Sequence, residues 1–157
     1  MLKRGIALLL ILLALGTALA ENNIETGEGT AMGIRIDIQA GEAVLTATLA
    51  DNSSAEAFAA LLANGPLTVA MHDYGGFEKV GPLPEKLPTN DERITTTPGD
   101  IILYLGDSIT IYYDVNTWNF TLLGHIDDVE PEMLREFLGD GDPEITFSLH
   151  EETPEEA

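Results

Sequence analysis

Apolar and polar residues alternate at the start of the region that can form a packed domain. From 32 to 38 every second residue is apolar, and small or charged residues stand between. This period of two predicts a strand with one buried face. A turn over 40–42 leads into a second apolar segment at 43–49, so we expect the two segments to pair as a hairpin.

Two helices are expected among the strands. Asp51-Asn52-Ser53-Ser54 offers capping side chains before an Ala- and Leu-rich helix over 55–63, which Asn64-Gly65-Pro66 ends. Pro131 suits the first position of a second helix over 132–138, and the glycines that follow terminate it.

Five more segments have the composition of strands, at 67–71, 100–105, 108–113, 116–126 and 144–150. The stretch 81–88 holds three prolines and is expected to be an extended connector, because proline cannot donate to a strand ladder. About seven or eight short strands with two helices predict a mainly β protein. We expect a small closed or nearly closed β-barrel with the two short helices at its ends.

The first twenty residues, 1–20, have the pattern of a signal peptide. Lys3 and Arg4 precede an apolar run over 6–15, and Ala18-Leu19-Ala20 presents the small residues that signal peptidase accepts. We expect cleavage after this motif and an exported protein, periplasmic or extracellular. An uncleaved N-terminal anchor is the alternative.

One folded domain is expected between two polar ends. Residues 21–31 are predicted to be a flexible lead-in, because they are polar, glycine-containing and without periodicity. The domain covers 32–150. Residues 151–157 are predicted to be a disordered acidic tail.

Acidic residues dominate the charge of the chain. Its 27 Asp and Glu residues outnumber 7 Lys and Arg residues, and the formal net charge is −20 at pH 7. A field of this sign repels nucleic acid and anionic membranes, so we expect neither as a partner and no stable membrane insertion after signal cleavage. The chain has no cysteine, which excludes disulfides, a thiol nucleophile and a cysteine zinc site.

Short motifs in a fixed order point to a known family. They are Ile34-Arg35-Ile36, the helix after Leu49-Ala50-Asp51-Asn52, Leu67-Thr68-Val69-Ala70-Met71, Glu78-Lys79, Leu83-Pro84, Leu87-Pro88, Pro98-Gly99-Asp100-Ile101 and Leu123-Gly124-His125-Ile126. With them, residues 32–150 resemble the cyclophilin-like barrel family of small bacterial and archaeal proteins. The resemblance implies a cyclophilin-like β-barrel and no established activity.

An aromatic run suggests a binding site in this barrel. Trp118 and Phe120 share one strand face at positions i and i+2, and asparagines flank them. Aromatics interleaved with amides suit a pocket for a peptide or a small molecule, although they also suit a barrel core. With the loop that carries Tyr74, Phe77 and Glu78, they make the predicted ligand-binding set.

Three polar segments carry residue types that bind metals or catalyse reactions. His72-Asp73 follows a predicted strand, but strand neighbours face opposite sides, which favours a solvated histidine over a catalytic pair. His125-Ile126-Asp127-Asp128 and Gly139-Asp140-Gly141-Asp142 lack the ligand spacing of a cation loop, and we interpret them as a turn and a helix exit. We predict no catalytic residue, no metal and no cofactor.

These observations favour a non-enzymatic module that binds a peptide or small molecule in the barrel groove. Cyclophilins isomerise X-Pro bonds with an arginine, a glutamine, aromatics and a histidine, and that set does not map onto this chain. A divergent peptidyl-prolyl isomerase of the cell envelope is the alternative. A third hypothesis is an accessory domain that binds a basic partner through its acidic surface.

Overall fold

The computed structural model describes residues 33–152. The predicted signal peptide (1–20), the predicted lead-in (21–31) and residues 153–157 of the predicted tail lie outside the described residues. In the described part, no helix has both the length and the apolar character needed to cross a membrane.

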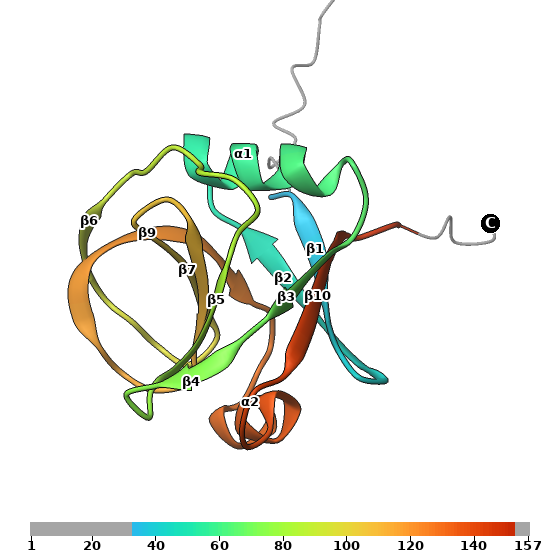
Figure 1. Cartoon of the computed structure of the whole chain (residues 1–157), viewed down its shortest axis with the longest axis vertical. Coiled ribbons are helices and arrows are strands. Elements are labelled where there is room, and N and C mark those ends of the chain that lie inside the picture. Colours follow the sequence, from blue (N-terminus) through green and yellow to red (C-terminus); the bar gives the residue numbers. More distant parts are fainter. Residues whose placement is uncertain (1–32, 153–157) are drawn as a thin grey trace, which may run out of the picture. The chain divides into compact units, whose positions relative to one another are not determined.

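Ten strands and two helices make up the described region, which confirms a mainly β fold. The strands are β1 (Arg35–Ala40), β2 (Ala43–Leu49), β3 (Leu67–Ala70), β4 (His72–Tyr74), β5 (Glu78–Pro82), β6 (Glu92–Thr95), β7 (Asp100–Tyr104), β8 (Ser108–Tyr112), β9 (Thr117–Ile126) and β10 (Glu144–Leu149). The helices are α1 (Ser53–Leu62) and α2 (Pro131–Leu138), which lie at opposite ends of the curled sheet (Figure 1).

The strands form one antiparallel sheet that curls towards closure (Figure 1). Its order is β3-β10-β1-β2-β9-β7-β8-β5-β4, and β6 pairs with the first half of β9. The end strand β3 lies directly against β5. A Cβ atom on Gly81 of β5 would stand 2.4 Å from Val69 Cγ1 and 2.7 Å from the Ala70 carbonyl oxygen. The sheet is therefore nearly closed rather than closed, because packing and not a ladder joins these two strands.

The main core fills the inner face of the curled sheet. Ile36 and Ile38 of β1 and Ile145 and Phe147 of β10 are fully buried, as their period of two predicts. Phe58 of α1 packs edge-on against Phe147, with ring centroids 5.8 Å apart. Burial of these side chains is what holds the sheet and helix together.

α2 begins at the predicted proline, whereas α1 begins at Ser53, two residues before its predicted start at 55. The Asn52 side chain caps α1 by accepting a hydrogen bond of 2.9 Å from the Ala55 backbone N–H, and it also donates to the Leu122 carbonyl of β9. Pro131 occupies the first turn of α2, and Gly139 ends that helix with φ of 64°.

Three strands were not predicted from the pattern. The segment 72–74 was expected to be a loop, but it forms β4 and pairs with β5 alone. Gly81 and Pro82, expected to belong to an extended connector, are instead the last two residues of β5. β5 and β6 pair with β8 and β9, which lie far along the chain, and β4 pairs only with β5, so local alternation does not reveal these three strands.

Candidate functional site

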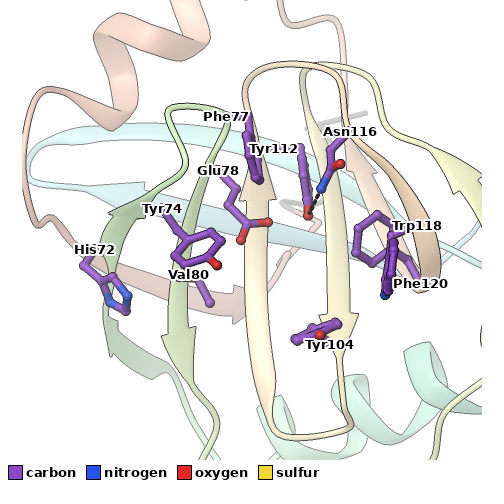
Figure 2. Close-up of a pocket in the computed structure, with 10 residues that line it drawn as sticks. All are labelled: His72, Tyr74, Phe77, Glu78, Val80, Tyr104, Tyr112, Asn116, Trp118 and Phe120. Atoms are coloured by element: carbon purple, nitrogen blue, oxygen red, sulfur yellow. Dashed lines mark hydrogen bonds between the residues drawn. The ribbon is translucent and has the colours of Figure 1, made fainter.

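The outer faces of five strands surround a cavity of about 400 Å³ (Figure 2). Its lining comes from β4, β5, β7, β8 and β9 and from two turns: His72, Tyr74, Phe77, Glu78, Val80, Tyr104, Tyr112, Asn116, Trp118 and Phe120. All five residues of the predicted ligand-binding set are among them. The structure thus brings together two segments that lie about 40 residues apart in the chain, through the ladders that join β5 to β8, β8 to β7 and β7 to β9.

A continuous series of aromatic contacts forms the wall of the cavity. Tyr74 meets Phe77 edge-on at 6.1 Å between centroids, and Phe77 stacks on Tyr112 at 6.0 Å with an interplanar angle of 6°. Tyr112 then contacts Phe120 at 5.5 Å, and Phe120 contacts Tyr104 at 6.3 Å. Such packing fixes each ring and presents apolar faces to the space between them.

The floor of the cavity is buried and its rim is exposed. Tyr112 and Phe120 have 2% and 3% of their surface exposed, and they form a small apolar cluster with Ile102. Tyr74 and Trp118 at the rim are 60% and 58% exposed. Large exposed aromatics beside a hollow mark a surface that can gain from contact with a ligand.

A two-glycine turn sets the position of Phe77. Gly75 and Gly76 have φ of 64° and 73°, which other residues rarely adopt. A Cβ atom on Gly75 would stand 2.3 Å from the Phe77 ring, so this ring packs onto the bare backbone of the turn. The Phe77 carbonyl accepts hydrogen bonds from the backbone N–H groups of Tyr113 (2.9 Å) and Asp114 (3.2 Å).

A buried threonine positions Asn116. The Thr96 N–H donates to the Asn116 carbonyl at 2.8 Å, and the Asn116 N–H donates to the Thr96 hydroxyl at 2.9 Å. This clamp holds the turn before β9. The Asn116 side-chain amide points at the Tyr112 hydroxyl at 3.5 Å, as Figure 2 shows.

Glu78 is the one acidic residue among those that line the cavity in the described region. It is 7% exposed, and one of its carboxylate oxygens has no hydrogen-bond partner among residues 33–152. Burial raises the pKa of Glu78 above its ordinary value, an effect that the Tyr112 hydroxyl partly offsets and the charge of Asp73 reinforces. Burial and the nearby Glu78 also raise the pKa of Tyr112 far above its usual range.

A polar cluster occupies the opposite face of the same strands. The Tyr113 hydroxyl donates to the Asp73 carboxylate, and Lys79 Nζ lies 3.3 Å from Asp73 and donates to the Gly141 carbonyl at 2.8 Å. The Tyr113 hydrogen bond lowers the pKa of Asp73, burial opposes this shift, and Lys79 adds to it. Burial and Asp73 raise the pKa of Tyr113 to about 12. The guanidinium carbon of Arg135 from α2 lies 4.8 Å from the centre of the Tyr113 ring.

Strand alternation separates residues that are adjacent in the chain, as the sequence predicts. His72 lines the aromatic cavity while Asp73 faces the polar cluster, so they do not act as a pair. Tyr112 and Tyr113 divide in the same way, but both are buried. Tyr112 is buried although it points away from the main core, because aromatic side chains cover the outer face of β8.

The remaining cavity residues were missed as site residues. Val80 and Tyr104 belong to no motif, and His72 and Asn116 were seen only as polar neighbours of other features. The strand register could have identified some of these residues. Glu78 lies directly opposite Tyr112 in the β5–β8 ladder, so both side chains share one face of the sheet. Without β5, that pairing could not be inferred.

The other polar segments form separate pairs. His125 Nδ1 lies 2.8 Å from an Asp100 carboxylate oxygen, and Asp127 accepts a hydrogen bond of 2.8 Å from the Thr48 hydroxyl. Between residues 33 and 152, no group of three or more His, Asp and Glu side chains is arranged to hold a metal ion.

Comparison with known proteins identifies the fold. A family model described as the cyclophilin-like family matches residues 38–149. The structure of McbB in complex with tryptophan is similar, with a TM-score of 0.52 and 15% identity; the match covers 77% of this chain and 46% of that one, so it spans less than half of McbB. The solution structure of the hypothetical protein AF2241 from Archaeoglobus fulgidus has a TM-score of 0.52 and 13% identity, covering 76% of this chain and 96% of that one. No curated protein matches the chain.

Proposed function

The chain belongs to the cyclophilin-like family, and we propose that it is a binding module that holds a small molecule or a peptide side chain in the aromatic cavity. The observation that carries the proposal is the cavity itself. Its volume of about 400 Å³ and its mainly aromatic lining with a few polar groups are typical of small-ligand sites.

The chemistry of the lining favours binding over catalysis. Around the aromatics stand one acid, one amide and one histidine, and no serine, threonine, lysine or arginine is among the described residues that line the cavity. The isomerase alternative gains no support from this lining, because the cyclophilin set includes an arginine. Fold alone does not supply an activity.

The protein is further proposed to act after export. The basic start, apolar run and small-residue motif of residues 1–20 support this, and the net charge of −20 argues against nucleic acid as a partner. N-terminal sequencing of the protein from the extracytoplasmic fraction tests it, with Glu21 as the expected first residue. A cytoplasmic protein that still begins at Met1 would contradict export.

Trp118 provides a direct test of binding, because it lines the cavity and is the single tryptophan of the chain. We expect its fluorescence to change in titrations with at least one member of a panel of phenyl compounds and proline-containing tripeptides. Val80→Phe fills part of the cavity and should weaken that binding about tenfold. Val44→Phe, the same change at an exposed strand residue outside the lining, is the matched control. A flat response to the whole panel, or equal affinity in both variants, would overturn the proposal.

A further inference from the structure

The carboxylate of Glu78 is placed where a ligand can reach it. Its side chain extends from β5 into the space between the Tyr74 and Tyr112 rings, as Figure 2 shows. It is 7% exposed, and one oxygen has no hydrogen-bond partner in the described part of the chain. A buried carboxylate oxygen without a donor is energetically unfavourable, so a donor from a bound molecule would relieve that cost.

The lysine that follows Glu78 in the sequence does not pair with this carboxylate. Lys79 is adjacent in sequence but faces the opposite side of β5, where Asp73 and the Gly141 carbonyl engage its ammonium group. His72 is the one basic side chain among the described residues that line the cavity, and it lies on the exposed strand β4. No lysine or arginine is among the described residues that line the cavity, so no permanent positive charge there complements Glu78.

We propose that the ligand carries a protonated amine joined to an apolar group, an inference that rests on the proposed binding function. The ammonium group donates to the free oxygen of Glu78, between the rings of Tyr74 and Tyr112. The apolar group packs against Phe120 and Trp118 towards the rim.

Two features favour an ammonium group over an uncharged donor. The faces of aromatic rings attract cations, and the cavity offers six such rings around one acid. The chain also has a net charge of −20, which attracts cations and repels anions as they approach. An alcohol would satisfy the oxygen of Glu78 but would gain from neither feature.

Three probes of similar size and different charge test the inference: phenethylamine, 2-phenylethanol and 3-phenylpropionate. Each is titrated against the full chain at neutral pH, with Trp118 fluorescence as the signal and calorimetry as a second readout. We expect the amine to bind at least about tenfold more tightly than the alcohol, and the carboxylate to bind most weakly. This comparison needs no variant.

Glu78→Gln keeps the size of the side chain and removes its charge. In this variant the amine should lose its advantage, and the amine and the alcohol should bind within about twofold of each other. Glu92→Gln, at an exposed residue of β6 outside the lining, is the matched control and should keep the preference. Circular dichroism shows whether both variants are folded.

The outcomes separate the two proposals. If the alcohol binds as tightly as the amine to the unmodified chain, or if Glu78→Gln keeps the preference, the amine inference is overturned while the binding function stands. If none of the three probes binds by either readout, the amine inference is again overturned. The binding function is then decided by the wider panel.

Discussion

Glu78 and Lys79 are neighbours in the chain, yet their charged groups lie on opposite faces of β5. Lys79 Nζ has two partners, the Asp73 carboxylate at 3.3 Å and the Gly141 carbonyl at 2.8 Å. One oxygen of Glu78 has none among residues 33–152. Because successive strand residues face opposite sides, one dipeptide places a paired base in the polar cluster and an unpaired acid in the aromatic cavity. The base supports the fold, and the acid is left for a ligand.

Glu78→Gln should change how stability depends on pH. Burial raises the pKa of Glu78 in the folded state, so its contribution to stability is full below the pKa of the unfolded chain and is lost as pH rises through the folded pKa. The free energy of unfolding of the variant, minus that of the unmodified chain, should therefore be higher at pH 7 than at pH 4. Urea unfolding of both proteins at both pH values measures this difference in stability. If the difference between the two proteins is the same at pH 7 and at pH 4, the raised pKa of Glu78 is contradicted.

Tyr113→Phe should have the opposite pH dependence. The Tyr113 hydroxyl lowers the pKa of Asp73, so the stability that this contact contributes is present at neutral pH and is lost as pH falls through the folded pKa of Asp73. At neutral pH we expect a loss of about 1 kcal/mol in the free energy of unfolding, the usual value for one hydrogen bond. Tyr104→Phe, at the rim of the cavity, is the control. A loss that stays constant down to strongly acidic pH would refute the link to Asp73.

Gly75→Ala and Gly76→Ala separate backbone strain from cavity shape. Both residues have positive φ, so each alanine should cost about 1 kcal/mol of stability. A Cβ atom on Gly75 also collides with the Phe77 ring, whereas one on Gly76 meets nothing within 4 Å. Gly75→Ala alone should displace Phe77 and weaken a cavity ligand about tenfold, measured by titration of Trp118 fluorescence. Equal affinities for the two variants would show that the position of Phe77 does not matter.

Gly81→Ala should show how closely β3 and β5 approach. The added methyl group would stand 2.4 Å from Val69 and 2.7 Å from the Ala70 carbonyl oxygen, so the end strand must move away. We expect a loss of about 1–3 kcal/mol in the free energy of unfolding, as for other overpacked sites. Gly41→Ala, at an open turn, is the control and carries only its own backbone strain. Urea unfolding measures the stability of both variants. If Gly81→Ala is at least as stable as Gly41→Ala, the close contact between β3 and β5 is contradicted.

Local patterns determined much of the architecture. The alternation in β1 and β10, the hairpin of β1 and β2, the asparagine cap of α1 and the proline at the start of α2 each depend on residues close in the chain, and the structure confirms them. The same locality placed Trp118 and Phe120 on one face, because positions i and i+2 of a strand share a side.

What only the tertiary structure decided is how distant segments pair. Strand β4 is short and exposed, β5 ends in glycine and proline, and β6 pairs only with β9, so none has a strong local signal. Their pairing places Glu78 opposite Tyr112 and encloses the cavity. The physical reason is that strand pairing is stabilised by contacts across the sheet, so a strand's register depends on a partner that its own sequence does not contain.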